Sequence, residues 1–360
     1  MLLELIALNN HKYFLGGASP NGFTTRFGKQ IADTDYSTYI IKGGPGTGKS
    51  SLMKKLADAF PDEDKDIYYC SADPNSLDSV VFKKSKVIFV DGTAPHIFDA
   101  EYPGAVQTIL NLGEYWDIGL LKSHKKEIIG ITKDYLQYHL RCKRFITAMS
   151  AVTADTIHIT SSALNLDKLD GFITRLSKKL FSKSDEGNLG KTEFKQISAL
   201  TPNGYLTFIP DNCEIYLLND PFYSGSDMFL RKFAEIITQK CFDVIISECT
   251  LHSNNFFEHI YIPDLNLVFI SANLINDITV SGKKIINFTR FYDKNILREK
   301  KARLKFNKKA VNDLKDEAIE CLVNAKKVHD KLERYYITAT DFDGINRLIY
   351  KLISQIKSNT

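Results

Sequence analysis

The chain has 360 residues, of which 44% are hydrophobic and 25% charged, and its formal net charge is +4. This composition is typical of globular proteins, and the length suggests two domains or one large one. No apolar run approaches the roughly 18 residues of a membrane span, and the N-terminus lacks the pattern of a signal peptide. Six cysteines without C-x-x-C spacing indicate reduced thiols and predict a cytoplasmic protein.

The first informative element is a glycine-rich motif at 43–50, Gly-Gly-Pro-Gly-Thr-Gly-Lys-Ser, which matches G-x-x-x-x-G-K-[ST]. An apolar β-branched run precedes it, and apolar residues at helical spacing follow it, which is the strand, loop and helix context of a phosphate-binding loop. Its amide groups and the helix N-terminus would bind phosphate oxygens. The predicted nucleotide-binding residues are Gly43, Gly44, Pro45, Gly46, Thr47, Gly48, Lys49, Ser50 and Ser51.

Strands are predicted near 38–42, 66–71 and 86–91, with a helix at about 50–60. Alternating strands and helices predict an α/β unit with a parallel sheet covered on both faces. The third strand ends in Asp91, where a Mg-nucleotide site needs a carboxylate. We therefore expect ATP and Mg²⁺ as cofactors, Lys49 on the β- and γ-phosphates, and Ser50 and Asp91 at the metal.

Two further residues lie where the carboxyl ends of the predicted strands meet. Asp73 follows the second strand, as a general base or as a turn residue before Pro74. His96 follows the third strand, as a γ-phosphate sensor, a proton acceptor or a structural histidine. The predicted catalytic residues are Lys49, Asp91, Asp73 and His96. Gly92 stands where many P-loop ATPases carry a glutamate, which favours phosphoryl transfer or slow hydrolysis.

Long polar segments without proline predict a helical arm at about 122–181 and a second at about 294–357. Both arms are basic, which indicates solvated helices, a nucleic-acid-facing surface, or a lid. A lid would donate Arg141, Lys143 or Arg144 to phosphates. No base-stacking or groove-reading motif supports nucleic acid. A polar, glycine-containing segment at 182–191 is the best linker candidate.

The chain repeats itself at long period. Ile40-Ile41-Lys42 matches Leu217-Leu218-Asn219 at an offset of 177, and Ser-Pro-Asn-Gly-Phe at 19–23 matches Thr-Pro-Asn-Gly-Tyr at 201–205. Collinear matches with a drifting offset indicate a duplicated unit of about 175 residues. The predicted domains are 1–185, an active P-loop NTPase-like unit, and 191–360, a degenerate repeat. We expect the two to pack as an intramolecular pseudo-dimer.

The second copy lacks the residues that would handle nucleotide. At the matching positions, Asp220 replaces Gly43, Tyr223 replaces Gly46, Ser226 replaces Lys49 and Asp227 replaces Ser50. Ser271 and Thr250 replace Asp91 and Asp73. A carboxylate at the phosphate entrance without a lysine is unfavourable. The second copy is predicted to be a pseudo-site.

Several motifs together resemble a known group: Gly-Gly-Pro-Gly-Thr-Gly-Lys-Ser-Ser at 43–51, Cys-Ser-Ala-Asp-Pro-Asn-Ser-Leu-Asp at 70–78, Val-Asp-Gly-Thr-Ala-Pro-His at 90–96, Pro-Gly-Ala-Val at 103–106 and Asn-Leu-Gly at 111–113. The chain is similar, over its whole length, to an uncharacterised bacterial family of duplicated P-loop NTPases, usually labelled "ATPase" or "nucleotide kinase-like". The resemblance implies Mg-ATP binding by residues 43–51 and Asp91. Relatives keep a second intact loop, from which this chain departs at 220–227.

Three functions are compatible with these patterns. The leading hypothesis is a Mg-ATP-binding P-loop NTPase with a single competent site that hydrolyses or transfers the γ-phosphate. The second is a small-molecule or nucleotide kinase in which Asp73 is the base and the basic arms form a lid. The third is a non-enzymatic, ATP-gated switch whose degenerate half docks a protein partner. The patterns identify neither a phosphate acceptor nor a partner.

Overall fold

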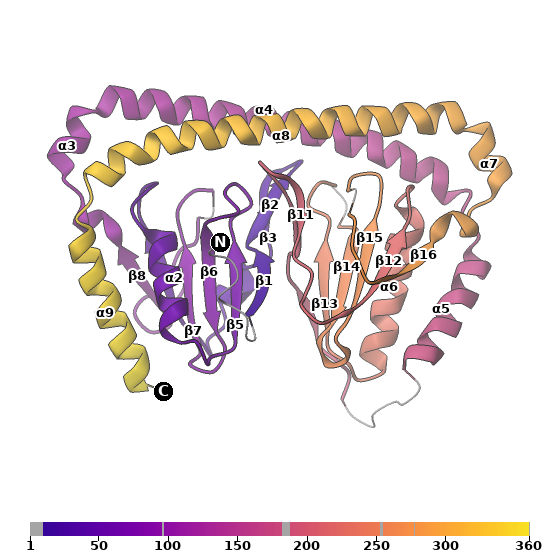
Figure 1. Cartoon of the computed structure of the whole chain (residues 1–360), viewed down its shortest axis with the longest axis horizontal. Coiled ribbons are helices and arrows are strands. Elements are labelled where there is room, and N and C mark those ends of the chain that lie inside the picture. The colour runs from indigo at the N-terminus through magenta and orange to yellow at the C-terminus, as the bar shows by residue number, and fades with distance from the viewer. Residues whose placement is uncertain (1–9, 96, 182–187, 253–254, 277, 360) are drawn as a thin grey trace.

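The computed structural model describes residues 10–95, 97–181, 188–252, 255–276 and 278–359. Two α/β units lie side by side, and a pair of long helices runs across the top of both (Figure 1). Among the described residues, no helix combines the length and the apolar character needed to cross a membrane.

Each unit is built on a six-stranded sheet. The first sheet has the order β1-β5-β6-β7-β4-β8. Its strands are β1 (Asn10–Phe14), β4 (Ser37–Lys42), β5 (Lys65–Tyr69), β6 (Leu77–Phe82), β7 (Val87–Asp91) and β8 (Gln107–Asn111).

The second sheet repeats this order strand for strand, as β9-β13-β14-β15-β12-β16. Its strands are β9 (Thr192–Phe194), β12 (Glu214–Asn219), β13 (Val244–Glu248), β14 (Phe257–Ile262), β15 (Leu267–Ala272) and β16 (Lys283–Asn287). The two sheets confirm the α/β class and agree with two tandem units.

The prediction of a parallel sheet is wrong in one respect, because both sheets are mixed. β6 is antiparallel to both of its neighbours, β5 and β7, and β14 is antiparallel to β13 and β15. Only residues 70–76 separate β5 from β6. A parallel crossover needs a dozen or more residues, so this short turn must reverse the chain. The remaining pairs, including β4 with β7 and β8, are parallel.

Short elements complete each unit. A two-stranded hairpin follows the first strand of each sheet, and a 3₁₀ turn and a short helix lead from the last strand into the helical arm. These elements are β2 (Gly16–Ser19), β3 (Gly22–Thr25), α1 (Gly28–Ile31), η1 (Leu112–Tyr115) and α3 (Ile118–Ser123), then β10 (Ser198–Thr201), β11 (Gly204–Thr207), η2 (Pro263–Leu265), η3 (Phe288–Phe291) and α7 (Lys294–Glu299).

Two long helices, α4 (Lys125–Ser161) and α8 (Lys301–Thr338), join the units. At 1.5 Å per residue each is about 55 Å long, enough to span both sheets. They run antiparallel, because Arg141 near the middle of α4 faces Glu317, while Asp155 near its end binds Arg303 near the start of α8. Figure 1 shows the pair crossing above both sheets.

The helices that follow the long pair are exchanged between the units. The first half supplies α5 (Leu166–Leu180), which packs on α6 (Ser224–Gln239) of the second half. The second half supplies α9 (Phe342–Asn359), which packs on α2 (Lys49–Ala59) of the first half. The core beside the first sheet therefore contains the α9 residues Ile345, Ile349, Leu352 and Ile356.

Two matching backbone contacts hold the exchanged segments. The Asp117 amide donates to Ala339 O at 2.7 Å, and the Asp293 amide donates to Ala163 O at 2.7 Å. Asp293 follows Asp117 by 176 residues, and Ala339 follows Ala163 by the same number. The same offset therefore relates residues of α4 to residues of α8.

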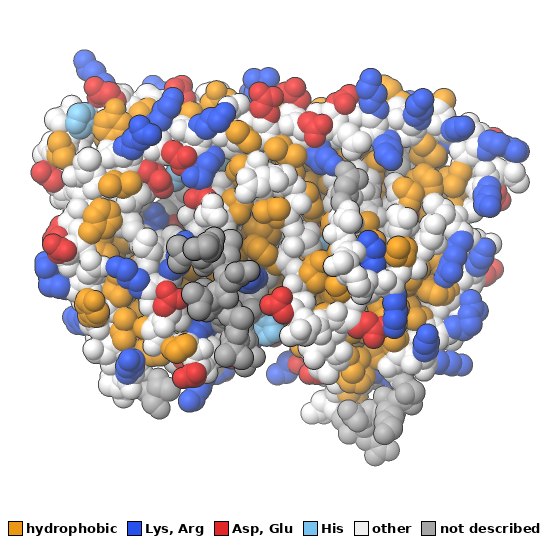
Figure 2. Space-filling view, viewed as in Figure 1, with side chains coloured by type: hydrophobic (Ala, Val, Ile, Leu, Met, Phe, Trp, Pro, Cys, Tyr) orange, Lys and Arg blue, Asp and Glu red, His pale blue; other side chains and the backbone are white. Residues whose placement is uncertain are grey.

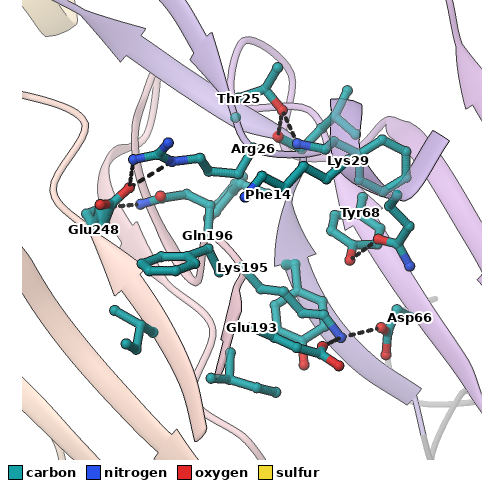
Figure 3. A pocket seen from close by; sticks show the side chains of 18 of the residues that line it. Phe14, Thr25, Arg26, Lys29, Asp66, Tyr68, Glu193, Lys195, Gln196 and Glu248 are labelled. Atoms are coloured by element: carbon teal, nitrogen blue, oxygen red, sulfur yellow. Dashed lines mark hydrogen bonds and ion pairs between the residues drawn. The ribbon is translucent and has the colours of Figure 1, made fainter. Parts of the chain in front are cut away.

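Charged side chains also join the halves, around a cavity of about 770 Å³ (Figure 3). Lys195 of the second half lies 2.8 Å from Asp66 and 2.7 Å from Glu193, and Arg26 lies 2.7 Å from Glu248. Burial would raise the pKa of Asp66, but the ion pairs with Lys195 and Lys83 outweigh it and lower the pKa. The buried carboxylate thus stays charged and ties the first sheet to the second half.

The exchange of α9 predicts that a change at the C-terminus destabilises the first half. Ile349→Asp should lower the free energy of unfolding by more than about 4 kcal/mol, because a carboxylate would be buried in the core between α9 and α2. Ile349 is 4% exposed and the next residue, Tyr350, is 72% exposed. Tyr350→Asp is therefore the matched control and should change stability by less than about 0.5 kcal/mol. Urea unfolding measures both, and equal effects would contradict the buried position of α9.

Candidate nucleotide-binding site

The glycine motif forms the loop between β4 and α2. Gly46 has φ 69° and Gly48 has φ 84°, which is the left-handed region that favours glycine. The Thr47 hydroxyl donates to Gly44 O at 2.8 Å and closes the loop. α2 begins directly after Gly48, so the free amides of its first turn lie at the loop.

Lys49 and Asp91 meet at the carboxyl edge of the sheet. β4 and β7 are parallel neighbours, with Ile41 opposite Asp91. The Lys49 ammonium donates to Gly44 O at 2.8 Å and to Gly43 O at 3.1 Å, and it lies 3.6 Å from Asp91 Oδ2. Burial raises the pKa of Asp91, against the opposing effects of Lys49 and of Thr93, whose amide donates to Oδ1 at 2.8 Å.

Asp73 lies in the turn between β5 and β6, and Ser50 contacts the end of the same turn. The Leu77 amide donates to Ser50 Oγ at 2.9 Å, which places residues 73–77 against the first turn of α2. The Asp73 carboxylate accepts from the Ser76 hydroxyl at 2.9 Å and from the Asn75 amide at 3.3 Å. The structure thus brings Lys49, Ser50, Asp73 and Asp91 to one edge of the first sheet. Ser51 is exposed on α2, and His96 lies outside the described residues.

Sequence reasoning missed a carboxylate beside this site. Asp78, on β6, is 5% exposed, and its negative charge contributes to the raised pKa of Asp91. It ends the 70–78 motif, where it was given no role. The available signal was the segment Leu-Asp-Ser-Val-Val-Phe at 77–82, in which Asp78 is the one charged residue of a largely apolar run. A carboxylate in a buried strand costs free energy unless it has a task or a partner.

The roof of the site comes from the other half of the chain. A Cβ atom built on Gly44 would lie 2.6 Å from the Tyr336 ring, and one on Gly46 would lie 2.9 Å from Glu333 O, so α8 lies directly on the loop backbone. Lys326, also on α8, lies 3.5 Å from Asp73.

The residues predicted to form the lid lie elsewhere. Arg141 is in the middle of α4, 3.9 Å from Glu317, and Lys143 and Arg144 are exposed nearby. The prediction assigned each arm to its own half. Because α4 and α8 cross, the end of each arm lies over the other half.

In the second half an internal carboxylate occupies the equivalent loop. Asp220 is fully buried and accepts from the Ser226 amide at 2.7 Å, the Phe222 amide at 3.2 Å and the Tyr292 hydroxyl at 3.0 Å. The Gly225 amide donates to the Tyr292 hydroxyl at 2.7 Å. The amides of Gly225 and Ser226 correspond to those of Gly48 and Lys49, so they already have oxygen acceptors from the chain.

The Asp227 carboxylate does not face the loop entrance, where a carboxylate was expected, and contacts β14 and α6 instead. It accepts from the Phe257 amide at 2.7 Å, as Ser50 does from Leu77, and pairs with Arg231 at 3.0 Å. Arg231, one turn along α6, is thus its counter-ion. The Lys49–Asp91 ion pair is replaced by the hydroxyls of Ser226 and Ser271, 3.2 Å apart. Asp220, not Asp227, closes this loop.

Comparison of the chain with protein-family models, with curated proteins and with solved structures finds no match.

The hydrogen bonds of Asp220 predict that its replacement by asparagine destabilises the fold. Asp220→Asn should lower the free energy of unfolding by about 2–3 kcal/mol, because the carboxamide has one accepting oxygen and would point an NH₂ group at another donor. Asp313→Asn, at an exposed position of α8, is the control and should be nearly neutral. Urea unfolding compares them. If both are neutral, Asp220 does not hold the loop closed.

Proposed function

We propose that the chain is a Mg-ATP-binding P-loop NTPase with one competent site, in the first half, that hydrolyses or transfers the γ-phosphate. The observation that carries the proposal is the position of Lys49. Its ammonium lies inside a loop shaped by two left-handed glycines, at the N-terminus of α2, and 3.6 Å from Asp91. A cation beside free helix amides and a nearby carboxylate suits a triphosphate with its metal. The resemblance to the bacterial P-loop family agrees with this assignment.

The residues present fit Mg²⁺. It prefers hard oxygen ligands, and the Ser50 hydroxyl and the Asp91 carboxylate would supply them at the end of β7 and the start of α2. When bound, the ion would neutralise charge on the β- and γ-phosphates. Lys49 would exchange the carbonyl oxygens of Gly43 and Gly44 for phosphate oxygens. Thr93 holds Asp91 through one carboxylate oxygen and leaves Oδ2 toward Lys49.

Hydrolysis is favoured over transfer with Asp73 as the base. Asp73 accepts hydrogen bonds from the Ser76 hydroxyl and the Asn75 amide in its own turn, and these would hold its carboxylate in place even when Lys326 turns to a phosphate. Phosphate release from ATP without any added acceptor would support hydrolysis. ADP production only with an acceptor would support the kinase alternative.

One observation favours the switch as a second candidate. The last turns of α8 lie on the backbone of Gly44 and Gly46, so a shift of this loop on nucleotide binding would act on a helix that spans both halves. Tight ATP binding without turnover would support this function. Nucleic-acid binding gains no such support, because on the face drawn in Figure 2 basic side chains along the crossing helices are interspersed with acidic ones.

The first functional prediction concerns stoichiometry. Lys49→Ala should abolish triphosphate binding, because it removes the loop cation, whereas Ser226→Lys should not create a second site, because Asp220 and Tyr292 already occupy the loop amides. Calorimetry with Mg²⁺ and a non-hydrolysable ATP analogue should give one nucleotide per wild-type chain and none for Lys49→Ala. Two nucleotides per wild-type chain would refute a single competent site.

Asp91 should carry the metal dependence. Asp91→Asn should weaken Mg²⁺-supported nucleotide binding by about tenfold or more, because a neutral amide replaces the carboxylate next to the metal. A Mg²⁺ titration at fixed nucleotide measures this. Asp73→Asn is the comparison, because Asp73 faces Lys326, and its Mg²⁺ midpoint should stay near the wild-type value. The same midpoint shift in both variants would place Asp73 at the metal as well.

A further inference from the structure

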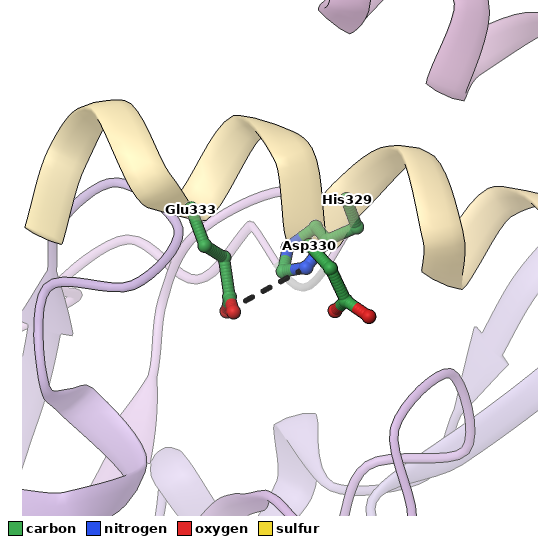
Figure 4. Close-up of side chains that lie close together, drawn as sticks. All are labelled: His329, Asp330 and Glu333. Carbon is green, nitrogen blue, oxygen red and sulfur yellow. Dashed lines mark ion pairs between the residues drawn. The ribbon is translucent and has the colours of Figure 1, made fainter.

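One face of α8 lies along the nucleotide site of the first half. Lys326, His329, Asp330, Glu333 and Tyr336 recur every three or four residues, so they share a face. Figure 4 shows the side chains of His329, Asp330 and Glu333 on the side of α8 that faces the first unit. His329 lies 3.6 Å from Glu333, and Asp330 pairs with Lys326 at 2.5 Å.

This face contacts the site at two points. At its C-terminal end, Glu333 and Tyr336 lie on Gly46 and Gly44. At its N-terminal end, Lys326 lies 3.5 Å from Asp73, in the turn that contacts Ser50 through Leu77. The ammonium of Lys326 therefore lies beside the turn that packs on Ser50. Burial lowers the pKa of His329, and the positive charge of Lys49 adds to that lowering.

The second half supplies an internal comparison. At the 176-residue offset, the residues of α4 that correspond to this face carry no charge. Lys326, His329, Asp330, Glu333 and Tyr336 correspond to Ser150, Thr153, Ala154, Ile157 and Thr160. Thr160 contacts the degenerate loop, 2.9 Å from the Ser224 hydroxyl, as Tyr336 contacts the intact one. The partner of Lys326 is replaced too, because Thr250 stands in place of Asp73. Charged side chains of a long helix thus lie over the first-half loop, which contains Lys49, whereas the corresponding side chains over the second-half loop are uncharged.

We propose that Lys326, supplied by the second half, is a second phosphate-binding cation of the nucleotide site and contacts the γ-phosphate. The inference rests on the proposed function, since it requires a triphosphate at the loop. The side chain is 29% exposed and is bound through ion pairs to Asp73 and Asp330. A lysine has a flexible four-carbon stem and three donors, so its ammonium can turn from Asp73 to a phosphate oxygen without movement of the helix. This gives the degenerate half a direct part in the intact site.

The test compares two adjacent lysines of α8. Lys326→Met removes the proposed contact, and Lys327→Met is the matched control, because Lys327 is exposed. Trp116 is the single tryptophan of the chain, and its ring lies 5.5 Å from that of Tyr336, so its fluorescence reports on the site. Titrations with Mg-ADP and with a Mg-bound non-hydrolysable ATP analogue, checked by calorimetry, give the affinity ratio of triphosphate to diphosphate.

Lys326→Met should weaken triphosphate binding by about tenfold or more and ADP binding by less than about threefold, the loss expected for one charge-assisted contact. Lys327→Met should match the wild type, and Lys326→Arg should recover most of the triphosphate affinity. Equal losses for the two nucleotides, or no difference between Lys326→Met and Lys327→Met, would overturn the inference and leave the proposed function standing. A wild-type chain that binds neither nucleotide would overturn both.

The Asp73 variant separates phosphate binding from tethering of the helix. If Lys326 only anchors α8 through Asp73, Asp73→Asn should reproduce the affinity ratio of Lys326→Met, and the inference is wrong. If Lys326 contacts the γ-phosphate, Asp73→Asn should retain or raise the wild-type ratio, because the lysine is still present and no longer has to leave its ion pair with Asp73. Circular dichroism and urea unfolding of each variant show whether the fold is intact.

Discussion

The antiparallel pairing of α4 and α8 is the constraint on which the rest of the structure depends. Each helix begins at its own half and ends over the other, so the helix that follows it must pack there. α9 consequently completes the core beside α2, and α5 the core beside α6. Burying apolar area is the main favourable term in folding, and here neither half can bury its core with its own residues alone. Each core therefore contains side chains from both halves.

This exchange gives the second half a structural part in the first. The second half supplies the roof of the intact loop through Glu333 and Tyr336, and the cover of α2 through α9. Its own loop is held closed by Asp220, which accepts a hydrogen bond from the Ser226 amide, and by the Tyr292 hydroxyl, which accepts one from the Gly225 amide. Because these two amides have acceptors within the chain, they need no ligand to satisfy them.

The charges of the two halves differ in a consistent way. The intact site gathers Lys49, Asp91, Asp73 and Lys326, and the corresponding positions of the second half are Ser226, Ser271, Thr250 and Ser150. Buried or half-buried charges are costly unless they are paired. Without a lysine in the loop, a carboxylate at the position of Asp91 would have no counter-ion. Burying the hydroxyls of Ser226 and Ser271 there costs less free energy than burying an unpaired charge. Within one chain, the charged residues of the first site are thus replaced by hydroxyl-bearing residues at the corresponding positions of the second half.

The sequence by itself determined the α/β class, the duplication, the two helical arms and the positions of Lys49, Ser50 and Asp91 at one sheet edge, because these depend on local periodicity and on short motifs. Only the tertiary structure decided the antiparallel strands β6 and β14, the exchange of α5 and α9, and the place of Lys326 and Tyr336 beside the loop. Tyr336 and Gly44, nearly 300 positions apart, meet because α4 and α8 cross above both sheets. No local sequence pattern indicates over which half a long helix ends. Asp227 is a different case, because its ion pair with Arg231 follows an i, i+4 spacing that is visible in the sequence.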